Sequence, residues 1–188
     1  LLRSCFFCVL SVIATAQSGS DDCGTPDPIA GFGTFGFDTL GATTGTEGQN
    51  NSSCSFFGST EISDDVWFAW TAPQDGPVRI STCDAFGDTK IAVYDGAACP
   101  TIEPIICNDD ACGLSGFMSE GVFAATAGSV YMLQIGNFSG AGGSSGLMEF
   151  APADGGGGGD PPANDDCDEA TEISESFGIL DGTTTDAS

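Results

Sequence analysis

The chain has 188 residues, of which 27 are Asp or Glu and only three are Lys or Arg, so its formal net charge at pH 7 is −24. So few basic residues cannot neutralise phosphate groups, which argues against nucleic acid and anionic membranes as partners. The chain contains no His, and this excludes a Ser-His-Asp or Cys-His catalytic arrangement and any imidazole metal site.

The first predicted element is a secretory signal peptide over residues 1–16. Arg3 precedes an apolar run over residues 5–13, and small residues follow it up to Ala16. The run is too short to span a bilayer, and no other stretch approaches ~20 apolar residues. We therefore expect cleavage after Ala16, a secreted protein that is extracellular or located at the cell surface, and no membrane insertion.

Residues 17–151 are predicted to form one β-sandwich domain. Alternating polarity and short apolar runs bounded by Gly, Pro and Asp predict strands over residues 33–39, 64–71, 78–83, 89–95, 103–107, 121–126, 129–136 and 145–151. Short strands with a turn about every ten residues, and no helical periodicity, are typical of an all-β fold. The sequence therefore predicts a jelly-roll-like antiparallel β-sandwich.

The strand that contains both tryptophans is apolar on its two faces. Val66, Phe68 and Trp70 alternate with Trp67 and Ala69. A central strand covered on both sides explains this pattern, and it predicts that Trp70 packs in the core. The alternative for Trp67 is an exposed aromatic platform for a sugar ring, so Trp67 is a candidate ligand-binding residue.

The densest group of oxygen-bearing side chains is Asn108, Asp109 and Asp110. If the strands at 89–95 and 103–107 pair in an antiparallel hairpin, this group returns to the end of the sheet where Asp88 lies. Hard oxygen ligands in turns suit Ca²⁺, which takes six to eight of them. Two interpretations stand: a Ca²⁺ site built by Asp109 and Asp110 with support from Asn108 and Asp88, or a group of Asx turns that cap backbone N–H groups.

Four motifs around this group carry a resemblance to a known family. They are Asp88-Thr89, Tyr94-Asp95-Gly96, Asn108-Asp109-Asp110 and Ala127-Gly128-Ser129-Val130-Tyr131. In this order they resemble the bacterial pre-peptidase C-terminal domain, over residues 60–150, in the Cys-rich repeat variety of large secreted bacterial proteins. The resemblance implies a calcium-associated β-sandwich that accompanies secreted enzymes without being one. Lys90 stands where members of that family usually carry an apolar residue.

Six cysteines lie in the predicted domain, an even number that predicts disulfides in an exported protein. They are Cys23, Cys54, Cys83, Cys99, Cys107 and Cys112. The sequence does not choose among the possible pairings, but the strand order favours Cys83 with Cys112, Cys99 with Cys107, and Cys23 with Cys54.

A Gly/Pro linker is predicted over residues 152–163, where a run of glycines precedes Pro161-Pro162. Residues 164–188 then repeat the start of the domain, because Asn164-Asp165-Asp166-Cys167 matches Asp21-Asp22-Cys23. We expect a tandem array in which residues 164–188 are the truncated start of a second copy, so that neighbouring repeats are intramolecular partners.

These features together predict a non-catalytic extracellular module with Ca²⁺ as its cofactor. Its expected role is adhesion, or holding a larger secreted protein to a polysaccharide, to a protein polymer or to a cell-surface matrix. Consecutive acids in hydrophilic turns usually stay ionised and solvated, which argues against a glycosidase and against an enzyme in general. A carbohydrate-binding module and a purely structural stalk repeat are the alternatives.

Overall fold

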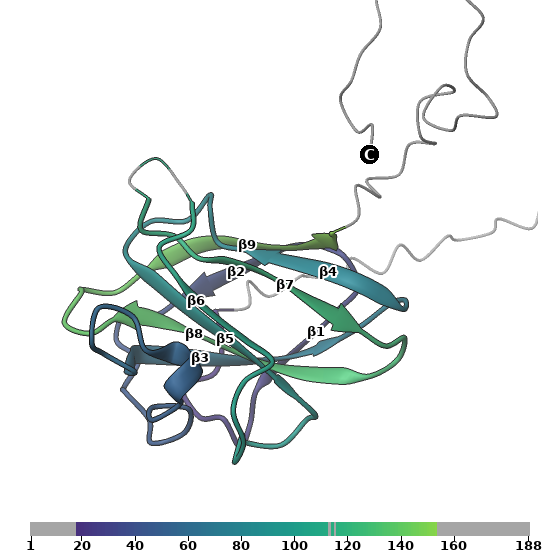
Figure 1. Cartoon of the computed structure of the whole chain (residues 1–188), viewed down its shortest axis with the longest axis horizontal. Helices are drawn as coiled ribbons and strands as arrows, with labels where there is room; N and C mark the ends of the chain where they lie inside the picture. The colour runs from purple at the N-terminus through teal and green to yellow at the C-terminus, as the bar shows by residue number, and fades with distance from the viewer. Residues whose placement is uncertain (1–17, 113, 115, 154–188) are drawn as a thin grey trace, which may run out of the picture.

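The computed structural model describes residues 18–153, except residues 113 and 115. Within this part of the chain there are nine strands, one short 3-10 helix (η1, Ser52–Cys54) and no α-helix. The strands form two sheets that pack face to face (Figure 1). The predicted all-β sandwich is therefore confirmed. The signal peptide, almost all of the linker and the second copy lie outside the described residues and stay predictions.

The larger sheet has five strands, in the order β1 (Asp27–Ala30), β3 (Ile62–Thr71), β8 (Val130–Phe138), β5 (Thr89–Asp95) and β6 (Ile106–Asp109). The smaller sheet has four, in the order β2 (Gly33–Asp38), β9 (Ser145–Pro152), β4 (Gly76–Ser81) and β7 (Glu120–Ala125). All neighbouring pairs are antiparallel except β1 with β3. The architecture is thus a mainly antiparallel sandwich.

Strand β1 is the element that the sequence pattern did not predict. It is short, it contains Pro28, and only Ile29 of its four residues is buried. A proline lacks the N–H that a central strand needs, so it is tolerated at a sheet edge. β1 occupies such an edge, where it pairs in parallel with β3.

The core between the sheets is built around Trp70. Its ring stacks on Phe150 with the centroids 4.5 Å apart, and its indole N–H donates to the carbonyl oxygen of Gly31 at 2.8 Å. Val66 and Phe68, which alternate with Trp70 along β3, are buried in the same cluster. This face of β3 and the core position of Trp70 are as predicted.

The predicted central strand covered on both faces is confirmed, and the alternative interpretation of Trp67 as an exposed sugar platform is wrong. Trp67 is only 1% exposed, on the opposite face of the larger sheet. It packs there beside Tyr94, with the ring centroids 6.2 Å apart, in a second buried cluster that includes Cys54 and Met132. Connecting segments cover this face, so an aromatic side chain that points outward from the sheet still does not reach solvent.

The described residues contain three disulfides: Cys23–Cys99, Cys54–Cys107 and Cys83–Cys112. The first two lie in the cluster on this outer face. The Cys83–Cys112 pair agrees with the prediction, whereas the predicted Cys99–Cys107 and Cys23–Cys54 pairs are wrong. Strand order indicates which end of a sheet a cysteine occupies, but not which face it points from. Cys107 lies on β6 and packs on the outer face of the larger sheet, where η1 presents Cys54.

Candidate metal site at the acidic end

The candidate site lies at one end of the sandwich, on the left in Figure 1. Three connections meet there: β4–β5, β6–β7 and β8–β9. Hydrogen bonds join them, since Phe138 N donates to Asp88 O at 3.1 Å and Thr89 N donates to Phe117 O at 2.9 Å. We call this region the acidic end, because it carries Asp84, Asp88, Asp109 and Asp110.

Three of the predicted site residues come together here. Asp88 precedes β5, Asp109 is the last residue of β6, and Asp110 follows it. The antiparallel register places Asp109 opposite Lys90, so the end of β6 lies beside the start of β5. One carboxylate oxygen from each of Asp88, Asp109 and Asp110 lies within 4.8 Å of the others. Asp110 has a left-handed backbone (φ 59°), which turns the chain out of the strand.

Asp109 is the unusual member of the group. Its side chain is only 4% exposed, and neither of its buried carboxylate oxygens has a hydrogen-bond partner. One buried oxygen of Asp88 also lacks a partner. Buried polar atoms are nearly always paired in folded proteins, because an unpaired one loses its hydration without compensation. A carboxylate in this state is chemically suited to a bound cation.

The electrostatics of the group agree with this interpretation. Burial, together with the negative charges of Asp110 and Asp88, raises the pKa of Asp109 to about 6, although Lys90 opposes the shift. Burial and Asp110 also raise the pKa of Asp88. Carboxylates that repel one another in a partly desolvated site gain from a divalent ion, which favours their charged forms.

Lys90 lies opposite Asp109 in the sheet, and the sequence pattern did not identify it as buried. It is fully buried, although its side chain is charged. Its ammonium donates to the carbonyl oxygen of Ser59 at 3.0 Å, and it lies over the rings of Phe56 and Phe138 at 5.3 and 5.7 Å. Burial lowers the pKa of Lys90, while Asp109, Glu61 and Asp88 act in the opposite direction.

The side chain of Asn108 has a different role from those of Asp109 and Asp110. Successive residues of a strand point to opposite faces, so Asn108 and Asp109 are directed apart. The side-chain oxygen of Asn108 accepts a hydrogen bond from Glu120 N at 3.0 Å. This contact caps a backbone N–H group and joins β6 to β7, but it links residues twelve positions apart and is not an Asx turn. Of the four predicted ligands, Asp88, Asp109 and Asp110 are therefore the candidates that remain.

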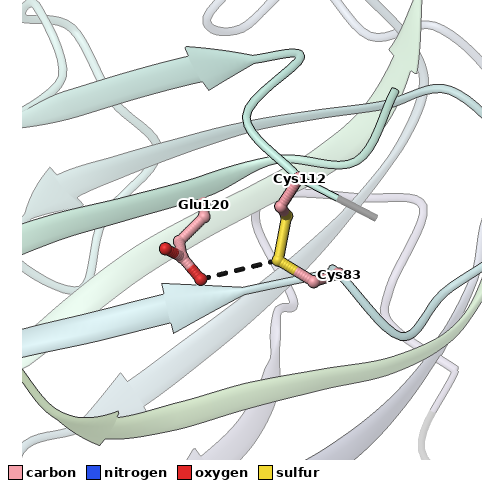
Figure 2. Close-up of side chains that lie close together, drawn as sticks. All are labelled: Cys83, Cys112 and Glu120. Carbon is pink, nitrogen blue, oxygen red and sulfur yellow. Dashed lines mark hydrogen bonds between the residues drawn. A yellow bond between two sulfur atoms is a disulfide. The ribbon is translucent and has the colours of Figure 1, made fainter. Parts of the chain in front are cut away.

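A second cluster, shown in Figure 2, contains Cys83, Cys112 and Glu120. A carboxylate oxygen of Glu120 lies 3.5 Å from Sγ of Cys83, and it also accepts from Arg79 at 2.9 Å. Both sulfurs are used in the disulfide, so they supply no thiolate ligand for a metal. The disulfide instead fastens the chain just after Asp110 to the β4–β5 connection.

The raised pKa of Asp109 predicts how stability depends on pH in the presence of a chelator. Between about pH 4 and pH 6 the folded state binds a proton that the unfolded chain has lost, so stability falls as pH rises through this range. Asp88 acts in the same direction. We expect the melting temperature in a chelator to fall by a few degrees from about pH 5 to about pH 7.5, and Asp109→Asn to flatten this dependence. If the melting temperature of the variant depends on pH as strongly as that of the native chain, groups other than Asp109 cause the pH dependence.

In the part of the chain that the structure describes, no helix has the length and apolar character needed to cross a bilayer. The three disulfides are typical of proteins in oxidising, extracellular surroundings.

Comparison with known proteins gives one family match. A sequence profile of a T9SS-associated family described as galactose binding domain-like matches residues 20–145. No curated protein matches the chain.

Solved structures are similar at a lower level. One is the pre-peptidase C-terminal domain of a collagenase from Bacillus anthracis, the kind of domain that the sequence motifs resemble; it is 12% identical with a TM-score of 0.40, and the match covers 66% of this chain and 93% of that one. Another is PliG of Aeromonas hydrophila, a periplasmic inhibitor of g-type lysozyme. It is 13% identical with a TM-score of 0.38, and the match covers 66% of this chain and 95% of that one.

Proposed function

Because this chain belongs to the T9SS-associated, galactose binding domain-like family, we propose that it is a non-catalytic extracellular binding module stabilised by Ca²⁺. Its role is to hold a larger exported protein to a polymer or to a cell-surface matrix. The observation that carries the calcium part is the buried carboxylate of Asp109, whose two oxygens have no partner in the protein.

The residues present fit Ca²⁺ better than other common metals. Asp88, Asp109 and Asp110 offer only carboxylate oxygens, and hard oxygen ligands suit Ca²⁺ or Mg²⁺ rather than Zn²⁺ or Cu²⁺. Three carboxylates, with Asp110 on the exposed side, suit the adaptable coordination of Ca²⁺ more than the strict octahedron of Mg²⁺. Bound there, the ion would cancel the repulsion among the three aspartates and fix the β6–β7 connection.

Several features argue against catalysis at the same site. A pKa of about 6 would suit a general acid, but the oxygens of Asp109 are buried and cannot reach a substrate. The chain has no His to serve as a base, and the cysteines of the domain are paired in disulfides.

A carbohydrate ligand is the second candidate, favoured by the description of the family as galactose binding domain-like.

A binding panel tests the proposal. The purified 188-residue chain is incubated in Ca²⁺ with insoluble polysaccharides and with immobilised matrix proteins, and the bound fraction is measured after washing. We expect retention on at least one polymer and no release of soluble fragments from any of them. Hydrolysis of a glycan or peptide would overturn the non-catalytic assignment, whereas a folded chain retained on no polymer would favour a structural stalk.

A further inference from the structure

A pocket of about 460 Å³ lies at the acidic end, beside the aspartate cluster. Residues 83–87 of the β4–β5 connection form one wall, and Leu114 and Met118 of the β6–β7 connection form the other. Phe86 at its rim is 77% exposed, and Leu114 is fully exposed. Side chains of this kind at the mouth of a hollow are typical of a contact surface for a partner.

The first wall of this pocket and Met118 of the second are held in place before any partner binds. The Cys83–Cys112 disulfide joins the two connections (Figure 2), and Cys112 and Met118 exchange backbone hydrogen bonds at 2.9 and 3.2 Å. Phe86 and Ser145 exchange another pair at 2.9 and 3.1 Å. A preformed pocket costs little ordering entropy when it is filled, which favours binding.

Glycine at position 87 allows the first wall to lie close to the β8–β9 connection. A Cβ atom at Gly87 would lie 2.2 Å from Oγ of Ser144 and 2.9 Å from its Cα. The backbone of Gly87 is also in the left-handed region (φ 108°), which favours glycine. The β4–β5 connection is therefore packed against its neighbour rather than loosely exposed.

The chemistry of the lining discriminates between classes of ligand. Apart from Asp84, the side chains that line the pocket are apolar or belong to the disulfide. Binding of a sugar needs several directed hydrogen-bond donors and acceptors, which this lining does not supply. An apolar side chain would fill it well. The rim and its surroundings carry Asp84, Asp88 and Asp110, on a chain of net charge −24, so a basic neighbour would be attracted.

We propose that this pocket binds a polypeptide segment that places an apolar or aromatic side chain in the pocket and a Lys or Arg beside Asp84. The inference rests on the proposed binding function, and it identifies the partner at this surface as a basic protein segment rather than a glycan. Phe86 is the main apolar contact, and Asp84 provides the charge contact.

The test uses a fluorescein-labelled peptide that alternates Lys and Phe, with fluorescence anisotropy as the readout on the whole chain. A Lys/Ser peptide lacks the apolar anchor, and a Glu/Phe peptide reverses the charge. The protein variants are Phe86→Ser and Asp84→Asn. Leu147→Ser is the matched control, since Leu147 is 50% exposed on β9 and does not line the pocket. Circular dichroism melting verifies that each variant is folded.

We expect Phe86→Ser to weaken binding of the Lys/Phe peptide about tenfold, as removal of a central aromatic contact does. Asp84→Asn should weaken it about two- to threefold and reduce its salt dependence. Leu147→Ser should change nothing, the Lys/Ser peptide should be indifferent to Phe86→Ser, and the Glu/Phe peptide should not bind.

Three results would overturn the inference. If Phe86→Ser binds like the native chain, or no more weakly than Leu147→Ser, the peptide is held only by general charge. If Phe86→Ser removes binding to a neutral oligosaccharide, the occupant is a glycan. If it removes a concentration-dependent self-association, the occupant is a second copy. The polymer panel separates this inference from the proposed function. If Phe86→Ser binds a polymer as the native chain does, the proposed function holds and this inference fails. If the native chain binds no polymer, the proposed function itself fails.

Discussion

Replacing Cys83 and Cys112 together by Ser is expected to lower the melting temperature by about 10 °C and to weaken the response to Ca²⁺. The bond closes a segment with a sequence separation of 29, for which the chain-entropy model gives about 3.6 kcal/mol. A loss of this size corresponds to about 10 °C in a domain of this length. The response to Ca²⁺ should weaken because Cys112 fastens the chain two residues beyond Asp110, a candidate ligand.

The matched control is the double substitution of Cys23 and Cys99. That bond spans a longer segment, with a separation of 76, so the loss of stability should be at least as large. It lies beyond the far end of β5 from Asp88, however, and the response to Ca²⁺ should persist. An equal loss of the Ca²⁺ response in both variants would show that the Cys83–Cys112 bond acts only through global stability. Peptide mapping without reduction should first recover Cys23 linked to Cys99.

The sequence predicts the sandwich well because most of its strands carry a local signal. Alternating or continuous apolar residues between turns identify every strand except β1, whose single buried residue, Ile29, forms no pattern. The strand predicted over residues 103–107 is displaced, however, because β6 runs over Ile106–Asp109. The two faces of β3 could also be separated, since Val66, Phe68 and Trp70 must share one side. What lies over each face is decided by segments distant in the chain, and this is why the sequence left the sugar platform open as an alternative for Trp67, which is buried.

The candidate site, like the fold, could be predicted only in part from the sequence. That Asp88 meets Asp109 and Asp110 follows from the antiparallel pairing of β5 with β6, which the sequence indicates. Which of the consecutive acids is buried depends on register and on the left-handed turn at Asp110, and composition carries no signal for either. The sequence does show that Lys90 is unusual, because it stands where the resembling family usually carries an apolar residue, but this comparison does not show that the side chain is buried.

Addition of Ca²⁺ is expected to raise the melting temperature of the native chain by about 10 °C near neutral pH. An ion that binds only the folded state at a hundredfold excess over its dissociation constant stabilises by about 2.7 kcal/mol, which corresponds to a shift of this size. Mg²⁺ at equal ionic strength should act much less, because it releases its water ligands reluctantly. General screening of the acidic surface would not distinguish the two ions.

Asp109→Asn separates a bound ion from a structural role of the side chain. In a chelator the variant should be as stable as the native chain or more stable, because it removes a buried charge that has no partner. In Ca²⁺ it should lose the stabilisation, so the order of the two melting temperatures should reverse between the two conditions. Asp84→Asn is the control, since Asp84 is exposed and lies outside the ligand cluster. Two outcomes would contradict the calcium site: equal melting temperatures of the native chain in Ca²⁺ and in Mg²⁺, or a Ca²⁺ response that persists in the variant. In either case the three aspartates form a turn that binds no ion.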